Sequence, residues 1–416
     1  MKKVKVWFFP MGVFIFISLF FGVAFAADSL NDAIKNGTID GEAKMWYQTN
    51  DRNPNDIFNK ESSIFSAGIR LGFITQIFNG FGAGVNFYSV DDLNAYGNFA
   101  NHSIHGVPHD ETWAWLGEAY LTYQLGNTQA KIGRQNIKSP LINSDAWALF
   151  PVNFEAYTIK NSDLPDTTLN ITYVTEERKR TSEQFDKIAE DGVLMLSAVN
   201  KSIPKTVLSA YYYYLNDADS TYYSPLIDNI SAVYLEAKTK ICKFNIGAQY
   251  MLLDPDNSVD ETDAYGAIFS TKLSIFNASV AFSSVGGDAE KNSLRAAKLS
   301  DNGAKTPLYT ATVSGDGDIA GAVGTDAVKV SVGVKPTDDF AITMNHGFYD
   351  HTGDSIAALR REKSTSTELV LKYTGINNIT LMAYYFYTDH NTVGAYRGYD
   401  ANDELSSIRF KAIYNF

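Results

Sequence analysis

The chain has 416 residues, a formal net charge of −12 and a single cysteine, Cys242. This acidic balance argues against nucleic acid as a partner, because phosphate binding depends on lysine and arginine. One cysteine excludes an intramolecular disulfide. After residue 26 no apolar run approaches the ~20 residues of a membrane-spanning helix, so any membrane crossing beyond that point must use β-strands.

Residues 1–26 have the composition of an export signal. Basic residues at positions 2, 3 and 5 precede an apolar stretch from 6 to 23, and Ala24-Phe25-Ala26 provides a small-x-small cleavage site. A permanent membrane anchor is the alternative, but Pro10 and Gly12 interrupt the stretch. We therefore predict cleavage near Ala26, a short periplasmic segment at 27–36 and a single domain over 27–416.

From Gly37 onward, apolar and polar residues alternate over segments of about ten residues, the length with which a tilted strand crosses a bilayer. In the first segment Ile39 and Met45 lie on one face, and Asp40 and Glu42 on the other. A soluble sandwich would bury the apolar face in its core. A membrane barrel would turn that face to lipid and the charged face to a water-filled lumen. One strand alone fits both architectures.

The succession of strands distinguishes them. Tight turns such as Asn79-Gly80 and Gly126-Asn127 alternate with long polar segments, as expected when short turns face the periplasm and long loops face the exterior. We predict an all-β, transmembrane antiparallel β-barrel of about eighteen strands, with about sixteen as the alternative count. The weakest strand starts at Asn153, and Gly286 to Gly324 is predicted to be one long external or infolded loop. The strands are expected at 39–48, 65–78, 81–90, 116–125, 128–135, 153–160, 168–175, 192–201, 205–215, 229–238, 242–252, 263–273, 275–285, 325–335, 340–349, 365–373, 379–387 and 405–416.

The final strand places Phe410, Tyr414 and Phe416 on one face, with Arg409 and Lys411 on the other. A terminal aromatic residue preceded by apolar residues at alternate positions resembles the insertion signal of outer-membrane barrels. This pattern predicts localisation in the outer membrane of a Gram-negative bacterium. The barrel-assembly machinery and outer-membrane lipids are then expected partners.

In a channel, the charges and hydrogen-bonding groups of the lumen decide which solutes pass. For any single lumen residue, simple solvation without a selective role is the alternative. The acidic net charge predicts a mild cation preference. Strand parity predicts that the pore is lined by Asp40, Glu42, Lys44, Arg70, Glu118, Tyr120, Lys131, Lys329, Lys372, Arg409 and Lys411.

The third external loop, Asn136 to Phe150, is the candidate for a segment that folds inward and narrows the channel. It carries Lys138, Asn143 and Asp145. Arg134 and Glu155 bracket it. We predict that these five residues form the constriction.

At this loop the sequence resembles the OprD-type family of outer-membrane porins, including members from the Campylobacter–Arcobacter group. The resemblance covers about Ser29 to Ile159 and implies an eighteen-stranded barrel, an inward third loop, passive uptake of small charged solutes, and a homotrimer. Many members carry an arginine shortly after the loop aspartate, where this chain has Ala146-Trp147-Ala148, which puts a basic side of the constriction in doubt at that spot. The motifs are Leu116-Gly117-Glu118-Ala119-Tyr120, Gly133-Arg134-Gln135, Pro140-Leu141, Asn143-Ser144-Asp145 and Pro151-x-x-Phe154-Glu155.

Two clusters of side chains offer ligands for a metal ion. The second external loop has an H-x-x-H-x-x-x-H spacing that suits a transition metal. A later acidic segment offers oxygen ligands for calcium but lacks the glycine turn of an EF-hand. For both segments, the alternative is a solvated loop that binds no metal. No G-x-S-x-G, H-E-x-x-H or phosphate-binding glycine loop is present, so we expect no enzyme. The residues concerned are His102, His105 and His109 in the first case, and Asp254, Asp256 and Asp260 in the second.

The sequence is therefore interpreted as a porin for passive, substrate-selective diffusion of small hydrophilic or charged solutes, such as amino acids, small peptides, organic acids and ions. The alternative is a barrel that anchors structural or adhesive loops at the cell surface. Glycines at predicted lumen positions, such as Gly68, Gly72 and Gly84, favour an open passage. Conductance in a planar bilayer distinguishes the two interpretations, because only a porin is expected to conduct.

Overall fold

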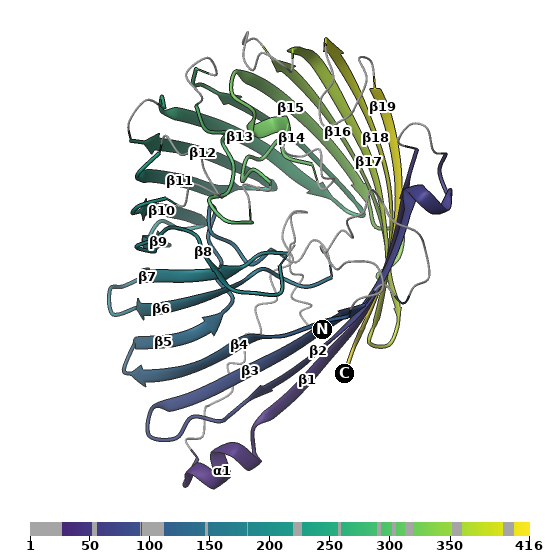
Figure 1. The fold of residues 1–416 in the computed structure, drawn as a ribbon. Coiled ribbons are helices and arrows are strands. Elements are labelled where there is room, and N and C mark those ends of the chain that lie inside the picture. The colour runs from purple at the N-terminus through teal and green to yellow at the C-terminus, as the bar shows by residue number, and fades with distance from the viewer. Residues whose placement is uncertain are drawn as a thin grey trace.

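The computed structural model describes residues 27–51, 56–91, 93, 112–145, 149–180, 182–218, 227–256, 259–288, 293–301, 305–312, 319–351, 360–393 and 403–416. The predicted export signal at 1–26 lies outside them. The described residues form one antiparallel sheet that closes on itself, because β1 (Thr38–Asn50) pairs with both β2 (Ser63–Ile74) and β19 (Asp403–Asn415) (Figure 1). Eighteen strands build the barrel wall, and the two-residue β8 (Asp186–Lys187) is a short addition to it.

The remaining strands follow the order of the chain around the barrel, and each pairs with its sequence neighbours. They are β3 (Phe81–Asp91), β4 (Thr112–Leu125), β5 (Thr128–Gln135), β6 (Asn153–Asn161), β7 (Thr167–Arg178), β9 (Val193–Asn200), β10 (Thr206–Leu215), β11 (Ile230–Ile241), β12 (Phe244–Pro255), β13 (Thr262–Leu273), β14 (Phe276–Val285), β15 (Thr325–Val334), β16 (Phe340–His351), β17 (Arg360–Ile376) and β18 (Ile379–Val393).

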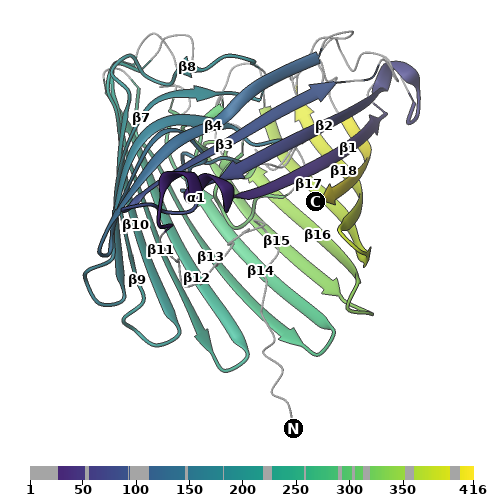
Figure 2. The ribbon, with the colours of Figure 1, turned by 90° about the horizontal axis from the view of Figure 1, so that it is seen from below.

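The predicted alternation of short turns and long loops is confirmed. Residues 126–127, 242–243 and 377–378 each join two long strands, and these turns lie at one end of the barrel, the lower end in Figure 2. The strand at Asn153 is present as β6, and the described parts of 286–324 contain no strand. Among the described residues, no helix is both long and apolar enough to cross a membrane.

A short helix, α1 (Leu30–Lys35), precedes β1 at the end of the barrel where the short turns lie. The Ser29 hydroxyl caps it by accepting the Asp32 backbone N–H at 3.1 Å, which satisfies one of the N–H groups that a helix start leaves without a partner. The Ala33 carbonyl accepts the Gln76 N–H at 3.0 Å, in the connection between β2 and β3. The helix is thereby fixed beneath the rim.

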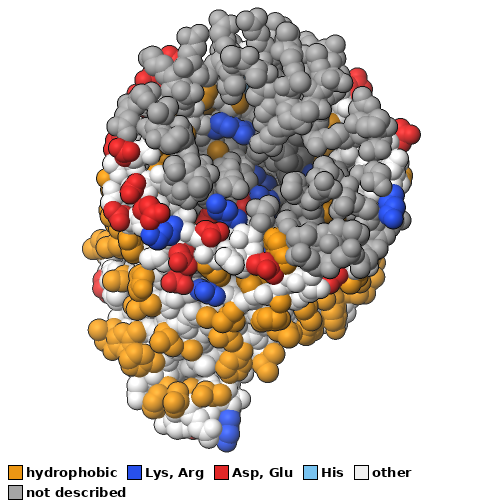
Figure 3. Space-filling view, viewed as in Figure 1, with side chains coloured by type: hydrophobic (Ala, Val, Ile, Leu, Met, Phe, Trp, Pro, Cys, Tyr) orange, Lys and Arg blue, Asp and Glu red, His pale blue; other side chains and the backbone are white. Residues whose placement is uncertain are grey.

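The two faces of the strands differ in exposure in the way a membrane barrel requires. On β3, Phe81 and Val85 point outward and are 59% and 42% exposed, while Asn86 and Tyr88 point inward and are buried. The outward face is therefore the apolar one, the reverse of a soluble sandwich. Hydrophobic side chains cover much of the outer wall in Figure 3, and lysine and arginine side chains are visible within the opening. The inward face is buried because loops fold into the lumen.

The barrel closes where β1 pairs with β19. Gly41 and Phe416 exchange two backbone hydrogen bonds, of 2.8 and 3.0 Å, and the Phe416 ring lies over Gly41 on the outer face. A Cβ atom at position 41 would lie 2.2 Å from the ring. A residue without a side chain is therefore required for the ring to occupy this place.

We expect the substitution Gly41→Leu to weaken the closure between β1 and β19. Displacing the Phe416 ring amounts to overpacking, which costs about 1–3 kcal/mol in well-packed sites. The measurement is the urea midpoint of the purified protein refolded in detergent, which requires no assembly machinery. Ala130→Leu, on the outer face of β5 away from the closure, serves as the control. Equal midpoints for the two variants would contradict the proposed role of Gly41.

Candidate functional site

The connection between β5 and β6 folds into the barrel. Leu141 and Ile142 are fully buried there and belong to the largest cluster of buried apolar side chains, which includes inward residues of β6 to β14. The Leu141 N–H donates to the Tyr213 hydroxyl of β10 at 3.3 Å. The burial of these two large side chains holds the loop against the wall, because apolar burial is the main source of stabilisation.

The other end of this loop packs against the opposite side of the lumen. Phe150 contacts the rings of Tyr88 and Trp115, with centroids 5.2 and 6.2 Å away. The Leu149 carbonyl accepts the Lys44 ammonium of β1 at 2.7 Å. The loop is thus attached to β10 at one end and to β1, β3 and β4 at the other, so it crosses the interior.

A second connection, between β14 and β15, also lies inside the barrel, where Figure 1 shows parts of it in green. The Leu299 N–H donates to the Leu141 carbonyl at 2.8 Å, and Asn143 donates to the Ser300 hydroxyl at 3.4 Å. The hydroxyl of Tyr309 donates to Glu236 of β11 at 2.8 Å. The two loops therefore contact each other as well as the wall.

Asp145 is the charged centre of the contact between the two loops. Its carboxylate lies 2.9 Å from the Lys298 ammonium and 3.5 Å from the Lys305 ammonium. Burial lowers the pKa of Lys305 to about 8, and the like charges of Lys298 and Arg180 act in the same direction, against the effect of Asp145. Among the described side chains, two ammonium groups therefore lie around one carboxylate at this point of the lumen.

The same region is anchored to β7. The guanidinium of Arg180 lies 2.6 Å from the carboxylate of Asp301, and both side chains are mostly buried. The Asp301 N–H in turn donates to the carboxylate of Glu177. Because a buried charge is costly unless it is paired and hydrogen-bonded, these contacts fix the position of the loop that carries Lys298 and Lys305.

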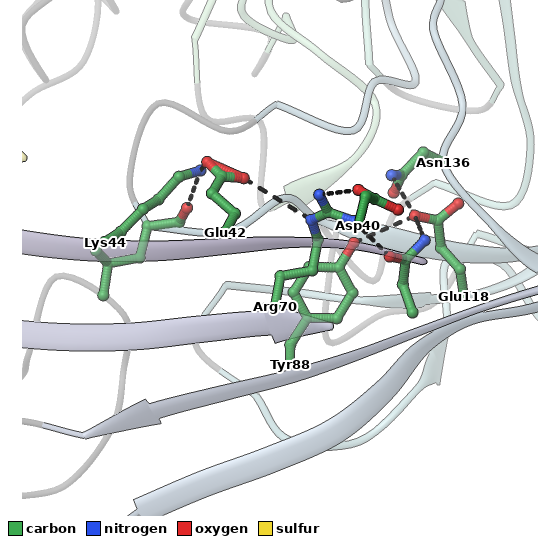
Figure 4. A network of polar contacts seen from close by, with 9 residues as sticks. Asp40, Glu42, Lys44, Arg70, Tyr88, Glu118 and Asn136 are labelled. Atoms are coloured by element: carbon green, nitrogen blue, oxygen red, sulfur yellow. Dashed lines mark hydrogen bonds and ion pairs between the residues drawn. The ribbon is translucent and has the colours of Figure 1, made fainter. Parts of the chain in front are cut away.

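A network of polar contacts covers the inward face of β1 to β4 (Figure 4). Arg70 of β2 pairs with Asp40 in a short contact, and its Nη1 donates to the Asn86 side chain at 2.7 Å. Asn86 and the Tyr88 hydroxyl both donate to Glu118, at 2.9 and 3.2 Å. Nearly every charge in this network has a partner of opposite sign, so this part of the wall is polar with little net charge.

Lys44 joins this network to the loop. Its ammonium lies 2.6 Å from Glu42 and also donates to the Leu149 carbonyl, while Asn136 of the loop donates to Glu118 at 2.9 Å. Figure 4 shows Lys44 and Glu42 on one side of Arg70, with Glu118 and Asn136 on the other. The network therefore positions both the cation and the loop that it contacts.

The last strand adds cations next to aromatic rings. Arg409 lies 4.3 Å from the centroid of Phe386, and the Lys411 ammonium lies 5.5 Å from that of Trp46. Lys411 is also within electrostatic range of Lys44, Lys305 and Asp145. The wall at the barrel closure and the two infolded loops thus face one another across the lumen.

The strand register directs most of the predicted pore-lining residues to the lumen. Lys131 lies over the Tyr120 ring at 3.6 Å, and Lys329 donates to the Ala311 carbonyl at 2.5 Å. Their role in selection stays a prediction. The inward set is Asp40, Glu42, Lys44, Arg70, Glu118, Tyr120, Lys131, Lys329, Lys372, Arg409 and Lys411.

Arg134 and Glu155, which were predicted to form part of the constriction, do not point into the lumen. Arg134 and Glu155 pair across β5 and β6 at 3.6 Å, two residues beyond Ile132 and Tyr157, which point outward and are 51% and 50% exposed. Because side chains alternate along a strand, Arg134 and Glu155 share that outward face. Their expected place in the lumen is therefore wrong.

The other loop predictions have mixed outcomes. Asn143 contacts the second loop through its backbone, and Asp145 contacts it through its carboxylate. Lys138 is mostly exposed, and the partial desolvation of its ammonium lowers its pKa. Residues 146–148, where family members carry an arginine, lie outside the described residues. The cations beside Asp145 come instead from Lys298 and Lys305, which no motif of the sequence indicates.

Phe410, Tyr414 and Phe416 lie on the outward face of the last strand and are 48%, 45% and 50% exposed. Their role as an insertion signal stays a prediction. Within the described ranges no three His, Cys, Asp or Glu side chains gather closely enough to hold a metal ion, and Asp254, Asp256 and Asp260 belong to those ranges. Calcium binding there is left as a prediction. The three loop histidines fall outside the described residues.

The comparisons with known proteins agree with this geometry. The family model described as "outer membrane porin, OprD family" matches residues 36–303, more than half of the chain. The chain belongs to the OprD family of outer-membrane porins. It is therefore a β-barrel channel of a Gram-negative outer membrane, as predicted, and its family and fold are those of channels rather than enzymes. No curated protein sequence matches the chain.

Several solved porins share the fold. OccAB3 of Acinetobacter baumannii has a TM-score of 0.72 at 14% identity, over 92% of this chain and 100% of that one. OccK3 (OpdO) of Pseudomonas aeruginosa has 0.70 at 14%, over 93% and 97%. OpdK of Pseudomonas aeruginosa, solved with vanillate, has 0.67 at 14%, over 92% and 99%. At such low identity the likeness shows the fold alone, and a closer kinship with the Campylobacter–Arcobacter members stays a prediction.

Proposed function

We propose that this OprD-family porin passes small organic anions by passive diffusion through a pore that its two infolded loops narrow. The observation that carries the proposal is the attachment of the 136–152 connection to both sides of the lumen, through Leu141 and Tyr213 on one side and Lys44 and Leu149 on the other. A solute that crosses the barrel must pass beside this loop. Small peptides and amino acids with a free carboxylate fall within the same class.

The charge beside the loop favours anions. Four ammonium groups, those of Lys44, Lys298, Lys305 and Lys411, surround the carboxylates of Glu42 and Asp145. A narrow, partly desolvated passage responds to the charges nearest the ion rather than to the net charge of the whole chain. The mild cation preference expected from the net charge of −12 is therefore replaced by a proposed anion preference.

Aromatic rings accompany these cations. The Lys44 ammonium lies 5.2 Å from the Phe150 centroid, and Trp46 and Phe386 flank Lys411 and Arg409. A ring next to a cation suits a solute that carries both an apolar ring and a carboxylate. The vanillate bound in OpdK, a porin of similar fold, is of that kind. Aromatic carboxylates are accordingly within the proposed solute class.

The test is purified protein in a planar bilayer under a potassium chloride gradient, followed by replacement of chloride with benzoate. We expect discrete channels, a reversal potential of the sign given by chloride permeation, and measurable benzoate current. An absence of channels would refute the porin function and support a surface anchor. Channels with a cation-selective reversal potential would refute the proposed anion preference alone.

The anion preference is expected to decline with a midpoint near pH 8. Lys305 is charged below its pKa of about 8 and neutral above it, so a rise from pH 7 to pH 9 removes one cation from the lumen. The measurement is the reversal potential as a function of pH. Lys305→Met is expected to have a lower anion preference and a smaller change over this range than the wild type. A wild-type profile without a transition between pH 7 and 9 would exclude Lys305 as a determinant of selectivity.

A further inference from the structure

An apolar groove of about 330 Å³ crosses the outer wall where the barrel closes. β16 to β19, β1 and β2 contribute its lining, and these strands are adjacent around the barrel (Figure 1). Its volume lies at the lower end of the ~300–1,000 Å³ of ligand pockets. The groove is separate from the lumen and has no part in the proposed passage of solutes.

The strand register shows that the groove faces outward. One row of cross-strand neighbours runs Met45, Ala412, Leu381, Tyr373, and its large members are 55%, 39% and 40% exposed, respectively. The next outward row includes Phe410, which is 48% exposed. Lys411 and Lys372, which lie between the rows, direct their side chains to the lumen and offer only backbone to the groove.

Two alanines shape the groove. Ala412 stands between Met45 and Leu381 in the first row, and Ala383 stands beside Phe410 in the second. Each small side chain has large apolar neighbours on the adjoining strands. Together they leave a depression with an apolar floor and apolar sides.

We propose that this groove is a binding site for a phospholipid acyl chain of the periplasmic leaflet. It is continuous with the apolar outer face that meets the bilayer, and its lining is almost wholly apolar, so a hydrocarbon chain is the chemistry that fits it. Phe340 is the first residue of β16, and Leu381 lies close to the start of β18. The groove therefore reaches the end of the barrel with the short turns, the end that faces the periplasm in this family of folds.

The test fills the groove with the double substitution A383L/A412L. Native mass spectrometry counts the phosphatidylethanolamine molecules that remain on the purified protein as detergent is removed with increasing collision energy. We expect one molecule to persist on the wild type, and the fraction that carries it to fall about fivefold or more in the variant. The matched control is A83L/A130L, which adds the same side chains to outward positions beside Leu121 and Tyr123, away from the groove.

Refolding is checked by the difference in gel mobility between heated and unheated samples, which reports the closed barrel for each variant. Retention of the lipid by A383L/A412L at the wild-type level would overturn the proposal. An equal loss in A83L/A130L would also overturn it, because the effect would then be general to the outer surface. Loss of a dimer or trimer instead of a lipid would identify a second copy of the chain as the occupant and refute the lipid site.

Discussion

The variant Leu141→Asp is expected to conduct about twofold or more current per channel than the wild type, because a wider passage offers less resistance. Leu141 is fully buried in the inner apolar cluster, where an unpaired carboxylate costs several kcal/mol. We expect the loop to leave the wall at Tyr213 and to enter the aqueous lumen or the exterior, because water then solvates the carboxylate. Single-channel recording in a planar bilayer measures the change, and higher noise from a mobile loop is expected with it.

Leu164→Asp is the matched control, because Leu164 lies in the short turn between β6 and β7 and is 52% exposed. Its conductance is expected to equal that of the wild type. Tyr213→Phe removes only the hydroxyl that holds the Leu141 N–H and is expected to raise the conductance slightly. A Leu141→Asp channel that closes the barrel normally and keeps wild-type conductance would refute the role of this loop as the constriction.

The substitution Lys411→Glu is expected to reduce the anion preference at least about fivefold, since one unit charge ~4 Å from an ion in water contributes about 1 kcal/mol and the substitution changes two units. Lys411 lies on the inward face of β19 beside Trp46, within range of Lys44 and Lys305. The reversal potential in a salt gradient reports the ratio of anion to cation permeability. The effect is expected to weaken at high salt, where the Debye length falls.

Lys201→Glu provides the control for this change in charge. Lys201 is exposed in the turn between β9 and β10, at the periplasmic end and outside the lumen. It alters the net charge of the chain by the same amount, so selectivity set by net charge would respond equally to both variants. Equal shifts would therefore refute the local origin of the preference, and a shift in Lys411→Glu alone would support it.

The barrel fold could be predicted from the sequence because it depends on local features, namely the length of each strand and the alternation of its side chains. A strand that crosses a bilayer needs about ten residues, and successive side chains point to opposite faces, so Ile39 and Asp40 could be assigned to opposite sides without knowledge of the neighbouring strands. The structure confirms this alternation, the strand at Asn153 and the number of wall strands. The same rule could have placed Arg134 outside, since it lies two residues from Ile132 on one strand.

The contacts between the two infolded loops could not be predicted from the sequence. Lys298 and Lys305 lie far from Asp145 along the chain and in a segment without periodicity. Nothing in that segment indicates which loop it meets. Their approach to Asp145 depends on the closure of the barrel and on the burial of Leu141 and Leu299 in one cluster.

The sequence by itself determined the strands, their two faces, the end of the barrel that holds the long loops and the charge of the wall. Each of these follows from the covalent geometry of an extended chain and from the thickness of a bilayer. The tertiary structure alone decided which charges meet inside the lumen. Lys44 reaches the Leu149 carbonyl only when the loop enters the barrel, and Lys411 reaches Trp46 only when β1 pairs with β19. The interaction of two charges depends on their distance in space and not on their separation along the chain.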